Sequence, residues 1–443
     1  MVHTFNFDEK YYLFDSESGS LYVCDLLTVE VVKKIKGEPY DLNGVEEEVV
    51  KEIESEIREI SDKGLLFADN KTDVPIKSDL VKALCLHICH DCNLRCEYCF
   101  AGKGKYKGKA EYMSFETAKS AVDFLIKNSG NRKILEMDFF GGEPLMNLDV
   151  VKKTVEYAKE QGAIFGKTFL FTLTTNGVLL NEANATWLNQ EMENVVLSLD
   201  GRKEVHDGVR KSPNGKGSYD VIVENIKRFV KMRGDKHYYV RGTFTNKNLD
   251  FGEDVLALAD DGLTEISLEP VVLDKNDPLY IDKSKLPEIR NEYRRLAKIY
   301  LERKKNGKGL FNFFHFNIDL EGGVCLKKRI SACGAGNEYF SVVPCGDIFP
   351  CHQFASDPEF KMGNVFEGKL DENIRSIFKN ANLYTKEKCK DCFAKYHCSG
   401  GCAANNIHYA GDINKPYEIT CDMMKARMEC ALHIYSENKN EQK

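Results

Sequence analysis

The sequence predicts an α/β fold in which parallel strands alternate with helices. Between about residues 80 and 304, six β-rich runs are each followed by a segment in which apolar residues recur at helical spacing. Such βα units pair in parallel through right-handed crossovers, which gives either an open doubly wound sheet or a partial barrel. Either way, the carboxyl ends of the strands form the edge where ligands bind. The runs are VKALCLHI, ILEMDFF, TFLFTLTT, NVVLSLD, YYVRGTF and EISLEPVV, and the helices are expected near residues 114–128, 148–160, 181–190, 219–233, 250–260 and 286–304.

The composition excludes several classes of protein. A length of 443 residues favours two or three domains. A formal charge of -7 without a basic block argues against a nucleic-acid surface, because that binding neutralises many phosphates. The N-terminal segment MVHTFNFDEKYY is not a signal peptide, and no run has the roughly 18 to 20 apolar residues of a membrane span. We therefore expect a cytoplasmic protein with no nucleic-acid partner and no membrane partner.

The first 76 residues are expected to form a small unit of their own. The stretch KYYLFDSESGSLYVCD has two alternating apolar and polar runs around a Ser/Glu/Gly turn, which is a hairpin pattern. A helical pattern follows, with Asn43 and Glu46 resembling a capping box at its start and Gly64 fitting its end. Strands and one helix in so short a segment indicate a winged-helix-like module.

Cysteines dominate the rest of the chain. Sixteen are present, and all but Cys24 fall within residues 85–99, 325–351 and 389–430. In a reducing compartment, clustered thiols bind metal more often than they form disulfides. After residue 310 only short apolar runs remain, so we expect metal to hold this segment together, and residues 436–443 to be a disordered tail.

The stretch CLHICHDCNLRCEYC contains the spacing C-x3-C-x2-C in two overlapping registers. Three thiolates on one loop can hold three irons of a [4Fe-4S] cluster and leave the fourth iron open, whereas closed structural zinc needs four ligands. Spacing alone does not choose the register. Cys85 lies inside a predicted strand, while the loop with Cys92, Cys96 and Cys99 is free to wrap a cluster. Cys89 is expected to be a spare thiol.

Resemblance to a known family supports the same register. CNLRCEYC resembles the signature of the radical S-adenosylmethionine (SAM) enzymes, with the aromatic Tyr98 before the third cysteine. The resemblance implies a partial (β/α)6 barrel in which the cluster of Cys92, Cys96 and Cys99 binds SAM. Tyr98 would then pack near the nucleoside.

Further motifs resemble those of the same family and occur in its order. FFGGEPLMN resembles the glycine-rich motif that contacts the methionyl amino group, although a Gly-Gly turn alone is usually only a turn. TTNG and LSLDG end the next strands, and EVHDGVRK carries an arginine suited to the SAM carboxylate, or simply a surface arginine. The implied SAM contacts are Tyr98, Gly141, Gly142, Glu143, Ser198, Asp200 and Arg210.

The C-terminal cysteines resemble the SPASM extension of radical SAM peptide-modifying enzymes, which carries two auxiliary clusters. For auxiliary cluster I the implied ligands are Cys333, Cys351 and Cys402, with Cys325 as the best fourth candidate. If no cysteine completes this set, a substrate thiolate can do so. For auxiliary cluster II they are Cys389, Cys392, Cys398 and Cys421.

The whole chain resembles the peptide maturases of the six-cysteine SCIFF type. This implies a leader-peptide recognition module (1–76), a radical SAM partial barrel (77–310) and a SPASM domain (311–435), with SAM and three [4Fe-4S] clusters as cofactors. The expected partners are a precursor peptide with a leader and an electron donor such as flavodoxin or ferredoxin. The implied reaction joins a cysteine sulfur to an α-carbon. One alternative is a sulfatase-type maturase that makes formylglycine, and another is a zinc-rich structural or redox protein without catalysis.

Overall fold

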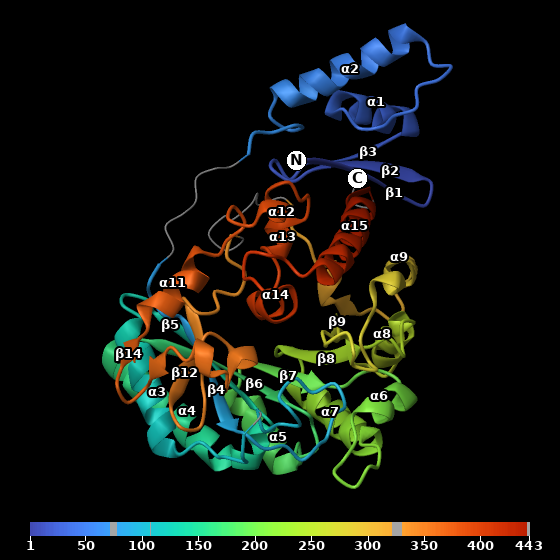
Figure 1. The fold of residues 1–443 in the computed structure, drawn as a ribbon. Coiled ribbons are helices and arrows are strands. Elements are labelled where there is room, and N and C mark those ends of the chain that lie inside the picture. The colour runs from blue at the N-terminus through green and yellow to red at the C-terminus, as the bar shows by residue number, and fades with distance from the viewer. Residues whose placement is uncertain (71–77, 107, 321–329, 441–443) are drawn as a thin grey trace.

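The computed structural model describes residues 1–70, 78–106, 108–320 and 330–440 and contains a large sheet with six consecutive parallel strands (Figure 1). Each of the six pairs with the next along the chain. The predicted partial (β/α)6 barrel is confirmed. The strands are β4 (Ala83–Cys89), β5 (Ile134–Gly141), β6 (Thr168–Thr175), β7 (Asn194–Ser198), β8 (Tyr238–Phe244) and β9 (Glu265–Pro270).

Helices cover the outer face of this curved sheet (Figure 1). Along β6, Phe169, Phe171 and Leu173 are buried beneath them, while the residues between these three face the barrel lumen and stay partly exposed. This alternation follows from the two-residue period of a strand. The helices are α3 (Phe115–Asn128), α4 (Leu148–Phe165), α5 (Glu182–Glu191), α6 (Lys203–Val209), α7 (Tyr219–Arg233), α8 (Phe251–Asp260) and α9 (Leu286–Asn306). All but the short α6 were predicted.

The large sheet continues beyond the barrel at both edges. The short β10 (Asn312–Phe313) pairs in parallel with β9. At the other edge, β11 (Tyr339–Val342) pairs in parallel with β4, and an antiparallel meander follows: β12 (Asp347–Phe349), β13 (Gly363–Asn364) and β14 (Lys369–Leu370). The C-terminal, cysteine-rich part is therefore joined to the barrel by backbone hydrogen bonds next to the strand that carries the first cysteine loop.

The N-terminal module has a three-stranded antiparallel sheet, β1 (Val2–Phe7), β2 (Lys10–Asp15) and β3 (Leu21–Cys24), with α1 (Leu26–Lys36) and α2 (Glu47–Asp62) above it (Figure 1). The predicted hairpin is β2–β3. The predicted capping box is wrong, because α2 is capped at Glu46 without a side-chain bond and the Asn43 amide donates instead to Asp41. The module has a small apolar core of its own, centred on Val31 and Val32.

A long C-terminal helix, α15 (Glu418–Asn440), lies against both the module and α9 (Figure 1). The tail expected at 436–443 is therefore wrong as far as Asn440, because tertiary packing extends the helix. Tyr12 Oη lies 2.7 Å from His433 Nδ1, Lys10 donates to Glu437 at 2.5 Å, and Lys304 donates to Asn438 at 2.6 Å.

The remaining C-terminal helices are short: α11 (Glu372–Asn380), α12 (Glu387–Lys390), α13 (Lys395–Cys398) and α14 (Ala403–Ala410). Within the described ranges, no helix has both the length and the apolar character needed to cross a membrane.

Candidate active site

The loop after β4 brings together the three cysteines predicted to hold the first cluster. Cys92, Cys96 and Cys99 line one cavity of about 150 Å³ at the carboxyl edge of the barrel. The same cavity is lined by residues at the ends of the neighbouring strands β5, β6 and β7, as expected for a parallel sheet. Six of the seven predicted SAM contacts are among its lining residues: Tyr98, Gly141, Gly142, Glu143, Ser198 and Arg210.

Two glycines hold the cysteine loop in place. The Gly142 amide donates to the Cys89 carbonyl at 2.8 Å, and the Glu143 amide donates to the Asp91 carbonyl at 2.9 Å. A Cβ on Gly142 would lie 1.9 Å from the Asp91 oxygen, and Gly141 has a φ of +121°, a conformation that favours glycine. The Gly-Gly pair thus lets the two backbones approach closely. Its predicted contact with the methionyl amino group stays a prediction.

Glu143 ties β5 to the end of β6. Its buried carboxylate accepts hydrogen bonds from Thr175 Oγ1 (2.8 Å), the Asn176 amide (2.8 Å) and the Leu145 amide (3.1 Å). Burial raises the pKa of Glu143 to about 7, and these hydrogen bonds oppose the increase. The side chain that the resemblance assigned to SAM therefore also sets the relative position of two strand ends.

Asp200 organises the other side of the cavity. Its Oδ2 accepts from Tyr98 Oη at 2.5 Å and from Arg210 Nε at 3.0 Å, and its Oδ1 accepts from the Thr243 amide at 3.0 Å. The Arg210 guanidinium lies 5.6 Å from the centre of the Tyr98 ring. Asp200 does not line the cavity but fixes two residues that do, so its direct contact with SAM stays a prediction.

Two further residues support the cysteine loop, and the sequence analysis did not single them out. Asn176, within TTNG, donates to Cys92 Sγ at 3.6 Å and to Asn93 Oδ1 at 2.7 Å. Gly104 has a φ of +88°, and a Cβ there would lie 2.6 Å from Cys92 Cβ. Asn176 could have been predicted from its place in the TTNG motif. No sequence pattern predicted Gly104, because the need for glycine there comes from its contact with Cys92, twelve residues earlier in the chain.

Cys85 and Cys89 lie outside the cavity lining. Cys85 is a buried residue of β4, as predicted. The Cys89 sulfur is buried 3.0 Å from the Glu143 carbonyl and 3.3 Å from that of Asp91, so it bridges the cysteine loop and the glycine-rich turn. This placement supports the register Cys92, Cys96 and Cys99.

The thiols of Cys92 and Cys96 are half-buried in the folded loop. Burial raises the pKa of Cys92 to about 12, and the Glu143 carboxyl adds to the effect. Burial also raises the pKa of Cys96 to about 11, although Arg210 acts against it. Metal loading must therefore release protons from these thiols. The three thiols converge on a cavity that is also lined by polar residues and by apolar ones such as Phe100 and Phe140. This arrangement fits a [4Fe-4S] cluster and SAM.

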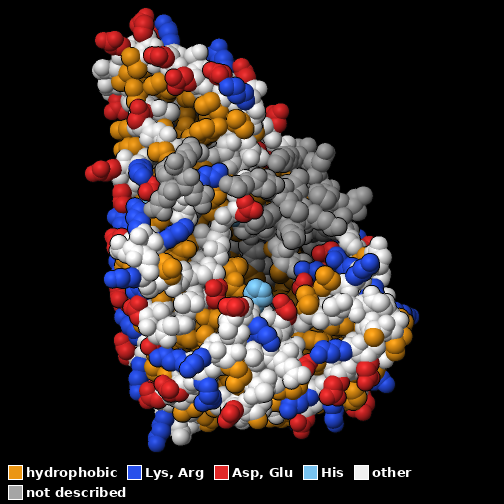
Figure 2. All heavy atoms as spheres, turned by 180° about the vertical axis from the view of Figure 1, so that it is seen from behind, with side chains coloured by type: hydrophobic (Ala, Val, Ile, Leu, Met, Phe, Trp, Pro, Cys, Tyr) orange, Lys and Arg blue, Asp and Glu red, His pale blue; other side chains and the backbone are white. Residues whose placement is uncertain are grey.

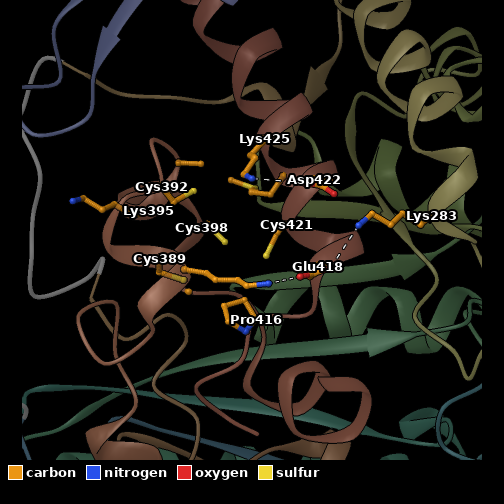
Figure 3. Close-up of a pocket in the computed structure, with 14 residues that line it drawn as sticks. Lys283, Cys389, Cys392, Lys395, Cys398, Pro416, Glu418, Cys421, Asp422 and Lys425 are labelled. Carbon is orange, nitrogen blue, oxygen red and sulfur yellow. Dashed lines mark hydrogen bonds and ion pairs between the residues drawn. The ribbon is translucent and has the colours of Figure 1, made fainter. Parts of the chain in front are cut away.

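A second cavity, of about 250 Å³, collects all four predicted ligands of auxiliary cluster II (Figure 3). Cys389 lies on α12, Cys392 follows it, Cys398 ends α13, and Cys421 is in the first turn of α15. Burial raises the pKa of Cys421 to about 12, and the three neighbouring thiols add to the increase. Four thiols around one cavity fit a cluster whose ligands are all cysteines.

Lysines surround this second cavity. Lys283 pairs with Glu418, and Lys425 pairs with Asp422 (Figure 3). Lys388 also pairs with Glu418. Lys395 instead forms a buried ion pair with Glu17 of the N-terminal module, and Tyr396 Oη donates to the same carboxylate at 2.7 Å. The module therefore packs directly on α13, the short helix that ends at the predicted ligand Cys398.

The three predicted cysteines of auxiliary cluster I also converge. Burial raises the pKa of Cys351 well above its usual value, and the nearby thiols of Cys402 and Cys333 add to the increase. Cys345 is exposed in the turn between β11 and β12. Cys325, the candidate fourth ligand, lies outside the described residues. Across the described ranges, no three His, Cys, Asp or Glu side chains are arranged to hold a single metal ion.

The barrel lumen contains a charged cluster that the sequence analysis missed. Glu269 of β9 pairs with Arg427 of α15 at 3.2 Å and with His315 at 3.5 Å. Arg427 donates to His315 Nδ1 at 2.9 Å. Burial lowers the pKa of His315 to about 4, so it is neutral at physiological pH. The sequence contained an indication of this cluster, namely Arg241 within YYVRGTF and Glu269 within EISLEPVV. A charged residue inside an otherwise apolar strand indicates the face that points into the lumen.

Two family models match the chain. Residues 86–258 match the radical SAM superfamily, and residues 333–393 match SPASM, described as an iron-sulfur cluster-binding domain. A cysteine-type anaerobic sulfatase-maturating enzyme from Clostridium novyi is 27% identical over 329 residues, which are 71% of this chain and 86% of that protein.

Two solved structures share the fold. One is anSMEcpe with bound AdoMet and Cp18Cys peptide, with a TM-score of 0.66 and 20% identity, over 82% of this chain and 99% of that one. The other is SuiB from Streptococcus suis bound to S-adenosylmethionine, with a TM-score of 0.52 and 16% identity, over 94% of this chain and 97% of that one.

Proposed function

Since the chain belongs to the radical SAM superfamily and carries a SPASM domain, we propose that it forms intramolecular thioether bonds in a ribosomally made, cysteine-rich precursor peptide. Its cofactors are SAM and [4Fe-4S] clusters. The proposal itself comprises the thioether product, the presence of three clusters and the precursor peptide as substrate.

The observation that carries the proposal is the joining of three parts in one chain. The SAM cavity, the four-cysteine cavity and an N-terminal module packed on α13, the short helix that ends at Cys398, form one connected structure. The likeness to SuiB extends over 94% of the chain, whereas that to anSMEcpe covers 82%. This difference favours a maturase with an additional N-terminal module.

The module offers a surface for a leader peptide. In the sheet order β1-β2-β3, β3 is an outer strand, and apolar side chains gather on the module in Figure 2. Val23, Leu26, Ile35 and Tyr40 are each 44% to 51% exposed. An outer strand next to exposed apolar side chains suits an extended peptide that adds to the sheet. Holding the leader there raises the effective concentration of the core peptide at the barrel.

Thioether formation removes a hydrogen atom from the α-carbon, a proton from the cysteine thiol and one electron. Cys92, Cys96 and Cys99 would hold the cluster that, with SAM, would supply the radical chemistry for removing the hydrogen atom, and the auxiliary clusters would take up the electron. In the proposal, the chain would hold SAM between Arg210, Ser198 and the glycine-rich turn. Asp200, which lies outside the cavity lining, keeps Tyr98 and Arg210 in position by accepting a hydrogen bond from each.

The test uses reconstituted enzyme, reductant, SAM and a cysteine-rich precursor peptide. We expect deoxyadenosine, together with a peptide that has lost two hydrogens and one alkylatable thiol per bond. Deoxyadenosine without these changes in the peptide contradicts the proposal.

A sulfatase-type maturase is the second candidate, and the 27% identity to the Clostridium novyi enzyme favours it. Its formylglycine product would react with a hydrazide probe and contain no crosslink. The match to an iron-sulfur cluster-binding domain over residues 333–393 speaks against the zinc-rich structural alternative. Anaerobic metal analysis tests this directly, since three cubes require about twelve irons with sulfide.

A further inference from the structure

Arg241 is the central charged residue on the lumen face of β8. Along this strand Tyr238, Val240, Gly242 and Phe244 are buried against the outer helices, and the residues between them face the lumen. Arg241 is exposed there. Among the described residues, its side chain makes no hydrogen bond and no ion pair.

The strand register places Arg241 beside the SAM cavity. Arg241 is opposite Ser198 of β7, a cavity-lining residue, and opposite Ser267 of β9 on its other side. Neighbouring strands of a sheet lie about 4.8 Å apart. Arg241 does not itself line that cavity, so its guanidinium belongs to the adjoining part of the barrel lumen.

The charges around Arg241 leave one positive charge unbalanced. Glu269 interacts electrostatically with Arg241, but its carboxylate already forms an ion pair with Arg427 at 3.2 Å. Burial, together with Arg427 and Arg241, lowers the pKa of His315 to about 4 against the opposing effect of Glu269, so this imidazole adds no charge at neutral pH. The charged groups that remain are Arg241, Arg427 and the carboxylate of Glu269. Their net charge of one positive unit suits a ligand with a single negative charge.

We propose that Arg241 binds a carboxylate in the barrel lumen next to SAM, and that this carboxylate belongs to an acidic side chain of the core peptide. The planar guanidinium matches a carboxylate with two parallel hydrogen bonds. This proposal rests on the proposed function, because it assumes a peptide in the lumen. The methionyl carboxylate of SAM is the other source of the same chemistry.

The experiment uses reconstituted enzyme with SAM and fluorescein-labelled synthetic peptides. Each peptide has one cysteine and one Asp at a varied distance from it, and each has a twin with Asn instead. Anisotropy gives the Kd of each pair for the native enzyme, Arg241→Gln and Arg241→Lys. Lys231→Gln is the matched control, because Lys231 is an exposed cation on the outer helix α7. Equilibrium dialysis gives the Kd of SAM for every variant.

We expect at least one Asp peptide to bind the native enzyme about 10- to 100-fold more tightly than its Asn twin. Arg241→Gln should remove this preference, Arg241→Lys should keep part of it, and Lys231→Gln should keep all of it. If Arg241→Gln instead raises the Kd of SAM by a similar factor, the carboxylate that Arg241 binds is that of SAM and not that of the peptide.

The inference is overturned if Arg241→Gln retains its iron and changes neither the Asp preference nor the Kd of SAM. Binding is measured without turnover. A failure of thioether formation would therefore leave the result for Arg241 readable, and the two proposals can fail separately.

Discussion

The SAM cavity and the auxiliary cluster II cavity are both lined by convergent cysteines, but they are supported differently. The first lies at the ends of hydrogen-bonded strands, and the backbones of Gly142 and Glu143 hold its loop. The second is built from two one-turn helices and the start of α15, over an apolar cluster of only three buried residues. A sheet can keep its cavity without a cluster, whereas we expect the auxiliary cluster II cavity to depend on metal to hold its short elements together.

The largest expected effect concerns chemistry at the first cavity. Replacing Cys92, Cys96 and Cys99 together by Ala should abolish SAM cleavage, because no ligands remain for the SAM-binding cluster. The barrel should still fold, since none of the three belongs to its buried apolar core, although Cys92 and Cys96 pack against the edge of that core. Deoxyadenosine is measured by chromatography, and circular dichroism checks the fold. Retained cleavage would mean that the cluster register is wrong.

The opposite pattern is expected at the second cavity. Cys421→Ala should remove about four irons and make residues near α12 and α13 sensitive to protease, while SAM cleavage continues. Cys345→Ala, at an exposed turn outside both cavities, is the control and should keep its iron. Unchanged protease resistance in an iron-depleted Cys421→Ala protein would contradict the proposed dependence on metal.

A backbone change should test how the SAM cavity is supported. Gly142→Ala places a Cβ 1.9 Å from the Asp91 oxygen and should separate the two loops, which we expect to weaken SAM binding at least about tenfold. Gly208→Ala is the matched control, because nothing lies within 4 Å of its added Cβ. Equilibrium dialysis measures the Kd of SAM. Equal values for both variants would remove the assigned role of the glycine pair.

The smallest effect concerns the contact between the module and α15. Burial lowers the pKa of His433 to about 4, below the ordinary value of about 6.5 for an unfolded histidine. The unfolded chain therefore takes up a proton that the folded chain resists. The contribution to stability is complete above about pH 6.5 and falls as the pH decreases toward 4. The Tm of the native protein should fall more steeply between pH 6.5 and 5.5 than that of His433→Gln, and parallel curves would contradict this.

The two cavities also differ in how far the sequence predicted them. The barrel strands were predictable because TFLFTLTT and YYVRGTF have clear β-rich patterns, and the structure gives β6 and β8 the same bounds. The cysteine sets were predictable by resemblance to family spacing. Charged residues of the lumen such as Arg241 and Glu269 lay inside predicted strands, but their meeting with Arg427 of α15 depends on tertiary packing that no local pattern encodes.

The C-terminal half was harder to predict for physical reasons. Strands β13 and β14 have two residues each, too few to show a period. Helix α15 has polar residues through its length, and its end is held by the N-terminal module through Glu437 and His433. Such elements are stabilised by long-range contacts more than by their own propensities.

The central claim is that the three cysteine sets serve one peptide-crosslinking reaction. The most direct test is tandem mass spectrometry of the precursor peptide after incubation with reduced enzyme and SAM. The account predicts a loss of two hydrogens and one free thiol per bond, with deoxyadenosine formed and no aldehyde detected. An aldehyde at a cysteine or serine, or a peptide unchanged while deoxyadenosine accumulates, would contradict it.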